Sequence, residues 1–228
     1  IGEVKEKLSQ IKKVLSDSAL QLSEQRRQAA VQLADGMEQQ LHLLEMEKAR
    51  FQVAQAVVEA EQGLMMNDRT LAFDASGVDQ IEFLIETNPG EGFKPLAKTA
   101  SGGETSRLML ALKTVLAEVD HIPTLVFDEI DSGIGGRVGM TVGEMLWNLG
   151  KQHQVLCVTH LPQLAAFGDQ HFHVSKRADN GRTSTQVGQL EGEARVQELA
   201  AMLGAGTPAT IQSAREILHT VAVKTSKI

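Results

Sequence analysis

Apolar residues in the first quarter of the chain recur in steps of three and four. Leu8, Ile11, Leu15 and Leu22 follow this spacing, with Ser18 at one seam position, which is the heptad pattern of a coiled-coil seam. After a shift of register the stripe continues through Ala29, Leu33, Met37, Leu41, Leu44 and Phe51. The pattern predicts an antiparallel coiled-coil arm over residues 1–66, built from one long helix or from two.

Helix-forming composition supports this reading of the arm. No proline precedes Pro89, and Gln, Glu, Leu, Ala and Lys dominate the segment, all of which are good helix formers. Gly36 marks a candidate break or bend. An ordinary pair of amphipathic helices in a bundle fits the same spacing and remains an alternative.

From about Asn67 onward, short apolar strands alternate with helical segments. The strands are expected at 70–74, 81–86, 125–127, 155–158, 172–175 and 183–189. The helices are expected at 105–118, 136–149, 161–166, 195–203 and 208–219. Apolar strands in alternation with helices indicate an α/β fold with a mostly parallel sheet and flanking helices. The sequence therefore predicts an α/β lobe over residues 67–228 that follows the arm.

Composition restricts the partners and the setting. A net charge of −7 argues against a uniformly basic surface for nucleic acid, although a local basic patch would still bind phosphates. The single cysteine, Cys157, excludes an internal disulfide and favours the reducing cytoplasm. No apolar run approaches the roughly 18 residues of a membrane span. The first residue is Ile1 rather than Met, so we expect the chain to be part of a longer protein.

Residues 101–104 read Ser-Gly-Gly-Glu at the expected start of a helix. Ser101 as N-cap and Glu104 as the third helical residue would form a capping box, and this structural role alone explains the pair. Gly102 and Gly103 cost stability in a first helical turn. They also leave backbone amides bare at the positive end of the helix dipole, which suits a phosphate group. The segment is therefore a candidate contact for a γ-phosphate.

Two adjacent carboxylates, Asp128 and Glu129, follow the apolar run of residues 124–127. Open α/β sheets bind ligands at the C-terminal ends of their strands, and neighbours on a strand point to opposite faces. Asp128 would hold the water shell of Mg²⁺, and Glu129 would orient and deprotonate an attacking water. A purely structural acidic pair at a strand end explains the same residues equally well.

A second apolar run, residues 155–158, ends in Thr159 and His160. A histidine at this position can donate to a phosphate oxygen or position a water molecule. A single histidine after a strand more often has a capping or packing role, so this signal is weak by itself. The order and spacing of the three segments together are more specific.

These segments together resemble the ATP-binding-cassette ATPases. Residues 101–104 resemble the signature motif, and residues 125–129 look like the Walker B strand with its catalytic glutamate. Asp131 matches the D-loop aspartate, and His160 matches the switch histidine. The heptads upstream narrow the resemblance to SMC-like proteins, because transporter cassettes place a compact helical subdomain before the signature.

Three stretches, residues 100–107, 126–131 and 158–163, are similar to the RecN family of bacterial DNA repair proteins, and residues 198–204 fit as well. Ala100 departs from the general cassette pattern, in which Leu commonly precedes the Ser. The resemblance implies the C-terminal lobe of an ABC/SMC-type ATPase head, joined to the returning arm of a coiled coil.

The resemblance also implies ATP and Mg²⁺ as cofactors. Asp128 would support the metal through water, Glu129 would activate the attacking water, and His160 would contact the γ-phosphate. The residues that would reach across to the ATP of a second subunit are Ser101, Gly102, Gly103 and Glu104. Two heads of a homodimer would then clamp two nucleotides.

The phosphate-cradling pattern Gly-x-x-x-x-Gly-Lys-Ser/Thr is missing from the sequence. The nearest fragment, Gly150-Lys151, is followed by Gln152 and lacks the earlier glycine. The family carries that loop in an N-terminal lobe of the same polypeptide, so this chain alone is expected to be inactive. The implied partners are that lobe, a second copy and DNA at double-strand breaks or ends, in the bacterial cytoplasm at the nucleoid, with no membrane.

Two other functions compete with this reading. A transport-type cassette would use the same chemistry beside a membrane partner, and the heptads argue against it. A coiled-coil interaction module with an inert α/β head would not need Asp128, Glu129 and His160 together. An assay of ATP turnover with the missing lobe supplied separates the enzyme from the inert module.

Overall fold

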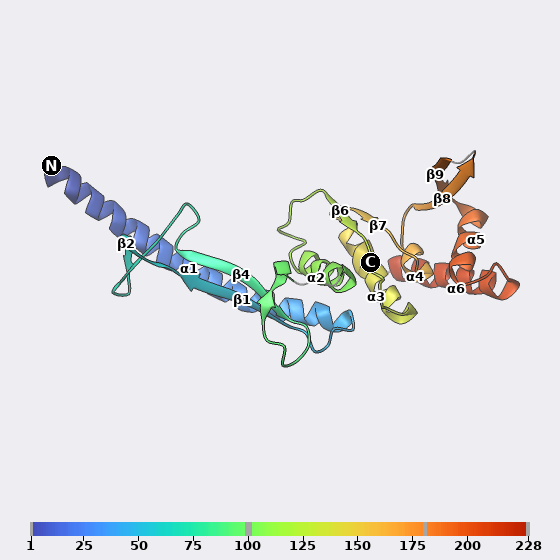
Figure 1. Cartoon of the computed structure of the whole chain (residues 1–228), viewed down its shortest axis with the longest axis horizontal. Helices are drawn as coiled ribbons and strands as arrows, with labels where there is room; N and C mark the ends of the chain where they lie inside the picture. The colour runs from blue at the N-terminus through green and yellow to red at the C-terminus, as the bar shows by residue number, and fades with distance from the viewer. Residues whose placement is uncertain (1, 99–101, 180–181, 227–228) are drawn as a thin grey trace. The chain divides into compact units, whose positions relative to one another are not determined.

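The computed structural model describes residues 2–98, 102–179 and 182–226 (Figure 1). Internal contacts group the chain into two compact units. Unit 1 comprises Ile1–His42 with Met46–Ala100, and unit 2 comprises Leu43–Glu45 with Ser101–Ile228. The two units are described separately below.

One helix, α1 (Gly2–Leu43), accounts for most of the predicted arm. It runs for 42 residues without a break at Gly36, which corresponds to a length of about 63 Å. Its buried residues are Ala19, Ser23, Met37 and Leu41. Toward its N-terminus, the seam residues Leu8 and Ile11 are 53% and 63% exposed. The single long helix is confirmed, and its coiled-coil partner stays a prediction.

The helical prediction was wrong beyond Leu43. The next segments are the strands β1 (Arg50–Val57) and β2 (Glu59–Met66). Phe51, Val53 and Val57 recur with the period of two that suits a strand, and β1 pairs antiparallel with β4 (Asp79–Glu86) along its whole length. This tertiary pairing outweighs the helical propensity of the individual residues. The division of the chain at residue 66 into arm and lobe stays a prediction.

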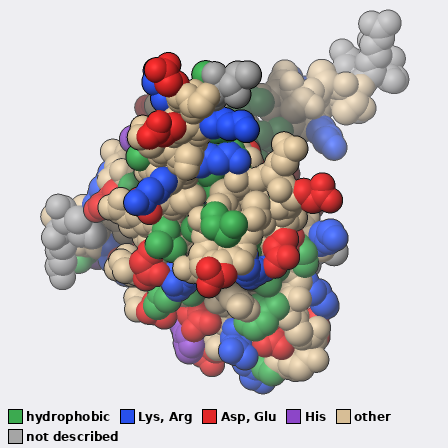
Figure 2. All heavy atoms as spheres, turned by 90° about the vertical axis from the view of Figure 1, so that its left-hand side faces the viewer, with side chains coloured by type: hydrophobic (Ala, Val, Ile, Leu, Met, Phe, Trp, Pro, Cys, Tyr) green, Lys and Arg blue, Asp and Glu red, His purple; other side chains and the backbone are tan. Residues whose placement is uncertain are grey.

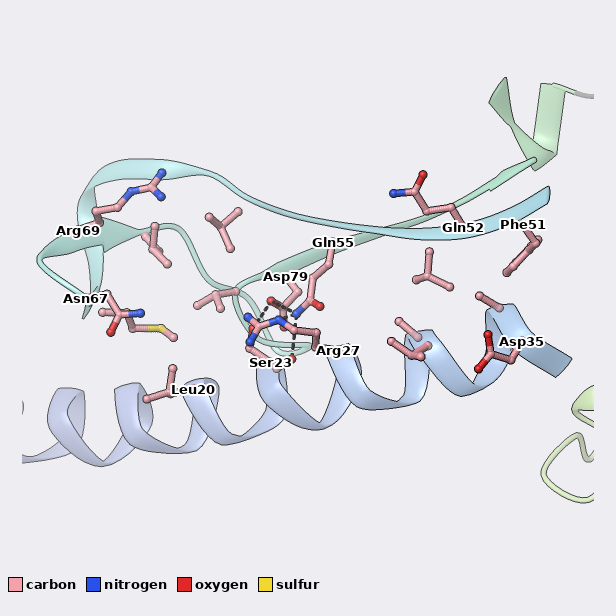
Figure 3. A pocket seen from close by; sticks show the side chains of 18 residues that line it. Leu20, Ser23, Arg27, Asp35, Phe51, Gln52, Gln55, Asn67, Arg69 and Asp79 are labelled. Atoms are coloured by element: carbon pink, nitrogen blue, oxygen red, sulfur yellow. Dashed lines mark hydrogen bonds between the residues drawn. The ribbon is translucent and has the colours of Figure 1, made fainter. Parts of the chain in front are cut away.

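Short strands complete unit 1. β3 (Arg69–Leu71) pairs with β2, and β5 (Lys94–Pro95) pairs with β4 ahead of the 3₁₀ helix η1 (Leu96–Lys98). The small core between α1 and these strands contains Ala19, Leu64, Met66, Leu71 and Val78. A groove of about 600 Å³ lies beside this core between α1 and the strands (Figure 3).

Unit 2 has the α/β architecture that the sequence predicts. Its helices are α2 (Gly102–Val115), α3 (Gly136–Leu149), α4 (Pro162–Ala165), α5 (Gly192–Met202) and α6 (Pro208–Thr225). Its strands are β6 (Thr124–Phe127), β7 (Gln154–Cys157), β8 (His171–Asp179) and β9 (Arg182–Leu190). Within the described ranges, parallel pairing is confined to β6 and β7, and the other paired strands are antiparallel.

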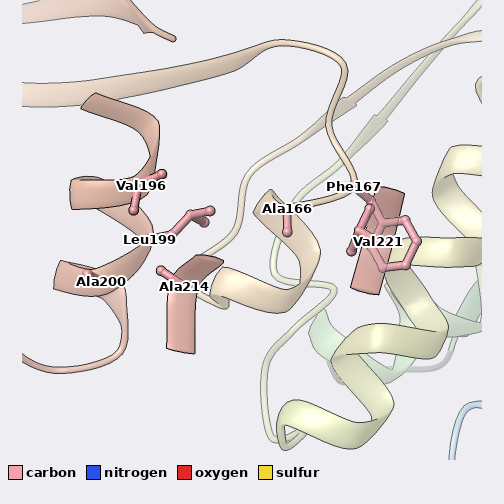
Figure 4. Packing of buried hydrophobic residues seen from close by; sticks show 7 residues of the cluster. All are labelled: Ala166, Phe167, Val196, Leu199, Ala200, Ala214 and Val221. Carbon is pink, nitrogen blue, oxygen red and sulfur yellow. The ribbon is translucent and has the colours of Figure 1, made fainter. Parts of the chain in front are cut away.

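A hydrophobic core joins the C-terminal helices of unit 2 (Figure 4). Its buried members are Ala166, Phe167, Val196, Leu199, Ala200, Ala214 and Val221. The Phe167 ring also packs onto α3 at Gly143, where an added Cβ would lie 2.3 Å from the ring. Any larger residue at that position would displace the ring, so the glycine sets the approach of α3.

The two faces of the β6–β7 pair differ in burial. Leu125 and Phe127 are 7% and 5% exposed, whereas Val126, Leu156 and Val158 are 68%, 51% and 63% exposed. Parallel sheets are normally covered on both faces. One apolar face of this pair is therefore left uncovered by the part of the chain that the structure describes.

The surface agrees with the mixed charge of the sequence. On the face shown in Figure 2, Lys and Arg side chains are interspersed with Asp and Glu side chains. None of the helices in the described ranges has the length and apolar character required to cross a membrane.

Candidate functional site

The start of α2 and the end of β6 meet in unit 2, and most of the candidate residues lie there. The chain leaves β6 at Phe127 and enters a loop of residues 128–133, which we call the acidic loop. Gly102 and Gly103 begin α2 against this loop. Ser101, the candidate N-cap and phosphate contact, lies outside the described residues.

Turn geometry, rather than strand pleat, separates the two acids of the acidic loop. β6 ends before Asp128, and Glu129 has a left-handed backbone with φ of 58°. The expectation that the two acids occupy successive strand positions was therefore wrong. The Asp128 Oδ1 atom accepts the Glu129 N–H at 2.9 Å, and the Glu129 carbonyl accepts the Ser132 N–H at 3.0 Å. A non-glycine residue in this region costs about 1–3 kcal/mol, and such residues cluster at functional sites.

Both glycines at the start of α2 allow a close approach to the acidic loop. A Cβ on Gly102 would lie 2.3 Å from the Glu129 Oε2 atom. A Cβ on Gly103 would lie 2.9 Å from the Ser132 Cβ atom and 3.2 Å from the Glu129 carbonyl oxygen. The sequence suggested bare amides for phosphate as the reason for these glycines. The structure adds a second reason at Gly103, because a side chain there would press against the Ser132 Cβ atom and the backbone of the loop, whereas at Gly102 the exposed Glu129 side chain could move aside.

Asp131 is the buried member of the acidic loop, with its side chain 4% exposed. One carboxylate oxygen, Oδ2, accepts the Thr159 hydroxyl at 2.5 Å and the His160 backbone N–H at 2.7 Å. The same oxygen lies 3.0 Å from the His160 Nδ1 atom. Asp131 therefore ties the acidic loop to the segment that follows β7.

His160 lies at the surface of this site. Its side chain is 72% exposed, although its Nδ1 atom is held by Asp131. A carboxylate this close to Nδ1 restricts the orientation of the imidazole ring. The other ring nitrogen, Nε2, is then the atom that can meet a ligand. The structure thus brings Glu129, Asp131 and His160 to one edge of the β6–β7 pair.

Two further residues of this site, Ser106 and Arg107 of α2, were missed by reasoning from the sequence. The Ser106 hydroxyl donates to the Asp128 carbonyl at 2.8 Å, and the Arg107 Nη1 atom donates to the Ser132 carbonyl at 2.8 Å. A signal was present, since Arg107 falls four residues after Gly103 and among the buried positions of the helix. A charged residue on the buried stripe of a helix points to a specific partner.

The described acids do not form a complete metal site. Among the described residues, no group of three or more His, Cys, Asp or Glu side chains is arranged to hold a metal ion. Asp128 and Glu129 are both exposed, which fits one carboxylate acting on the water shell of a Mg²⁺ ion. These residues fit a Mg²⁺–nucleotide only when other protein supplies the phosphate cradle.

Cys157, on β7 beside the site, is a poor candidate for chemistry. Burial raises the pKa of its thiol to about 12, and the Asp131 and Asp128 carboxylates add to the shift. A thiol with this pKa is protonated at neutral pH and is a weak nucleophile. Its partly buried position suits a small packing side chain.

Comparisons with known proteins agree on one family. No family model matches the chain. It is 39% identical over 220 residues to the DNA repair protein RecN of Halalkalibacterium halodurans, covering 96% of this chain and 38% of that protein. It is 36% identical over 223 residues to RecN of Bacillus subtilis, covering 96% of this chain and 39% of that protein. Over 129 residues it is 52% identical to RecN of Xylella fastidiosa, covering 57% of this chain and 23% of that protein.

The chain thus spans less than two fifths of the length of these relatives. Solved SMC head domains are similar only in part. One from Pyrococcus yayanosii, with a coiled coil and joint, gives a TM-score of 0.47 at 19% identity and covers 74% of this chain and 28% of that one. A match of this strength decides nothing about function.

Proposed function

The chain belongs to the RecN family of DNA repair proteins, and from this premise we propose that it is the C-terminal part of an SMC-like ATPase. In this proposal, residues of unit 2 contribute to ATP hydrolysis in a longer protein that acts in recombinational repair of double-strand breaks. The observation that carries the proposal is the convergence of Glu129, Asp131 and His160 at one edge of the β6–β7 pair.

A second lobe completes the site in this proposal. Its phosphate-binding loop is missing from this sequence, and the relatives are more than twice as long as this chain. The uncovered apolar face of Val126, Leu156 and Val158 supports such a lobe, because a parallel pair of strands is normally covered on both sides. We therefore expect residues 1–228 alone to hydrolyse no measurable ATP.

Each side chain has a distinct role in the proposed reaction. Asp128 would hold a water ligand of Mg²⁺, and the ion when bound would supply neutralisation of charge on the phosphates. Glu129 would accept a proton from the attacking water, since its exposed carboxylate lies at the turn that follows the strand. His160 would contact a γ-phosphate oxygen through Nε2, while Asp131 holds Nδ1.

The start of α2 would act on a second nucleotide. Ser101, Gly102, Gly103 and Glu104 would contact the ATP held by another subunit, so that two heads close on two nucleotides. The exposed position of Gly102 supports this arrangement, whereas Gly103 is buried against the acidic loop. Its amide would therefore contribute less than that of Gly102. DNA is proposed as a partner because the relatives are DNA repair proteins.

The substitution Glu129→Gln, in a chain of full family length, tests the proposal. The amide cannot accept the proton of the attacking water, so kcat for ATP should fall about 10²- to 10⁴-fold. ATP binding should persist, and closed dimers should accumulate. Steady-state turnover, nucleotide binding by equilibrium dialysis and dimerisation by sedimentation would be measured together.

The neighbouring exposed acid Glu118 provides a control, since it lies after α2 and outside the acidic loop. Glu118→Gln changes the charge by the same amount and should leave kcat unchanged. Wild-type turnover by Glu129→Gln would remove Glu129 from the role of base. No turnover by the wild-type protein, with the second lobe present, would refute the ATPase proposal.

A further inference from the structure

Arg107 is a charged residue enclosed within unit 2. Only 8% of its surface is exposed, and its Nη1 atom donates to the Ser132 carbonyl at 2.8 Å. Its Nε atom is buried and has no hydrogen-bond partner among the described residues. Burial lowers the pKa of the guanidinium, an effect that the nearby Glu104 carboxylate opposes. Enclosing a charge in this way is unfavourable, so the contact with Ser132 calls for a functional explanation.

The acidic loop is held by α2 at both of its ends. Ser106 binds the carbonyl of Asp128, the first residue of the loop, and Arg107 binds the carbonyl of Ser132 near its end. Glu129 and Asp131 lie between these two anchors. The Glu129 backbone is in the left-handed region, which is unfavourable for a side-chain-bearing residue. Two anchors from one helix turn would keep the loop in this conformation.

The same helix begins with the candidate signature residues. Gly102 packs against the Glu129 carboxylate and Gly103 packs against the Ser132 backbone. Four residues of one helix start therefore contact the loop that carries the proposed base: Gly102, Gly103, Ser106 and Arg107. A movement of this helix start on engaging a second subunit would be passed directly to Glu129.

We propose that Arg107 is a positioning residue that fixes the acidic loop to the start of α2, so that engagement of the signature residues sets the position of Glu129. The inference rests on the proposed ATPase function and adds to it a connection between two nucleotide sites. Arginine suits this role because its fork of donors remains charged and binds a backbone carbonyl strongly. Ser106 is the second, weaker anchor.

The test measures kcat and KM for ATP in a chain of full family length, for Arg107→Met and Arg107→Lys. Methionine fills much of the buried volume but has no donor, so kcat should fall about 10- to 100-fold, the effect expected of a misplaced catalytic group. KM should stay close to its wild-type value, because the phosphates are held by the other lobe. Lysine retains a charge and a single donor group, and it should recover part of the lost rate.

A double-mutant cycle with Glu129→Gln separates positioning from a general loss of structure. If Arg107 acts through Glu129, Arg107→Met should lower the residual rate of the Glu129→Gln protein no further. If Arg107→Met does not fold, Arg107→Lys is carried through the same cycle. The proposal would be overturned if the kcat losses of Arg107→Met and Glu129→Gln multiplied in the double variant. A wild-type kcat in either folded Arg107 variant would overturn it as well.

Arg195, which is partly buried, provides a control for the loss of an arginine that donates to backbone carbonyls. Its Nη2 atom donates to the carbonyls of Ala165, Ala166 and Gly168, and its Nε atom is also buried without a partner among the described residues. Arg195→Met should lower thermal stability to a similar extent and leave kcat of the folded protein near the wild-type value. A loss of kcat equal to that of Arg107→Met would make both effects structural and overturn the proposal.

The outcomes also separate this inference from the function on which it rests. Turnover by the wild-type protein with equal turnover by the Arg107 variants would refute the positioning role alone. A wild-type protein that hydrolyses no ATP would refute both.

Discussion

Two buried aspartates, one in each unit, make a direct comparison between architecture and chemistry. Asp79 in unit 1 has a side chain that is 1% exposed, and Asp131 in unit 2 has a side chain that is 4% exposed. Each accepts a hydrogen bond from a hydroxyl group on another element, Ser23 for Asp79 and Thr159 for Asp131. The two aspartates differ in their charged or ionisable partner, which is Arg26 for Asp79 and the exposed His160 ring for Asp131.

The bonds of Asp79 stay within unit 1, beside the groove between α1 and the strands. Its carboxylate accepts from Ser23 at 2.7 Å and from Gln55 at 2.8 Å (Figure 3). It also forms an ion pair with Arg26 at 3.0 Å. Gln55 also donates to the carbonyl and the hydroxyl of Ser23. Helix α1 and the strands β1 and β4 are thereby joined at one point. All the polar groups of this cluster satisfy one another.

The bonds of Asp131 lead instead to the surface, because one of its partners is the exposed ring of His160. The neighbouring acids Asp128 and Glu129 are exposed as well. A buried carboxylate whose partners are buried or partly buried groups of the same packed unit stabilises a fold. One that orients an exposed imidazole, beside exposed acids, prepares a site for a ligand. Burial of the central acid alone does not separate the two cases.

Asp131→Ala should give the largest effect that distinguishes the two aspartates. Without its carboxylate the His160 ring loses its Nδ1 partner and the acidic loop loses its tie to Thr159. In a chain of full family length kcat for ATP should fall about 100-fold. Asp79→Ala, measured in the same assay, should keep kcat near the wild-type value. Equal losses of kcat in the two variants would contradict the comparison.

Asp79→Ala should instead reduce the free energy of unfolding of residues 1–228. Removing one partner of a buried ion pair costs about 3–5 kcal/mol, because the Arg26 charge and the Ser23 hydroxyl lose their acceptor. Chemical denaturation followed by circular dichroism of α1 measures the change. Glu59→Ala is the control, since it breaks the exposed pair with Arg69 at 2.7 Å and should cost less than about 1 kcal/mol. If Asp79→Ala and Glu59→Ala lowered the free energy of unfolding equally, the contribution of the Asp79 ion pair to stability would not depend on its burial.

The smallest expected effect is the pH dependence that Asp79 adds to stability. Burial favours a higher pKa for this carboxyl, but the hydrogen bonds from Gln55, Ser23 and Arg26 outweigh it and hold the pKa below its usual value. Its stabilisation is therefore complete above the unfolded-state pKa of about 3.9 and is lost as the pH falls through the lower folded-state value. Denaturation midpoints of wild type should fall over this range, and those of Asp79→Asn should fall less. If the midpoints of wild type and Asp79→Asn changed equally with pH, Asp79 would not be the cause of the loss of stability at low pH.

Much of unit 2 could be predicted from the sequence, because its segments are short and uniform in character. The strand expected at 125–127 forms as Thr124–Phe127, and the helix expected at 136–149 forms as Gly136–Leu149. The residues after Leu43 could not be assigned correctly. The apolar positions from Leu41 to Phe51 fit the spacing of a helix, and only the pairing of β1 with β4 makes the strand more favourable.

The residues of the candidate site could be predicted from the sequence only in part. Motif spacing identified Asp128, Glu129, Asp131 and His160, because strand ends in an α/β fold meet at one edge. It gave no distances between them and no partner for Arg107. The roles of the glycines against Glu129 and Ser132 depend on atoms from another segment of the chain, and no local pattern contains that information.

The sequence by itself determined which residues could do chemistry and which family the chain resembles, because the identity and order of side chains define a motif before any folding. The tertiary structure alone decided that Asp131 is buried beneath His160, that Glu129 occupies a left-handed turn, and that Arg107 holds the loop between them. The physical reason is that burial, backbone strain and hydrogen bonds across 25 or more residues arise only when distant segments compete for the same space and the same polar partners.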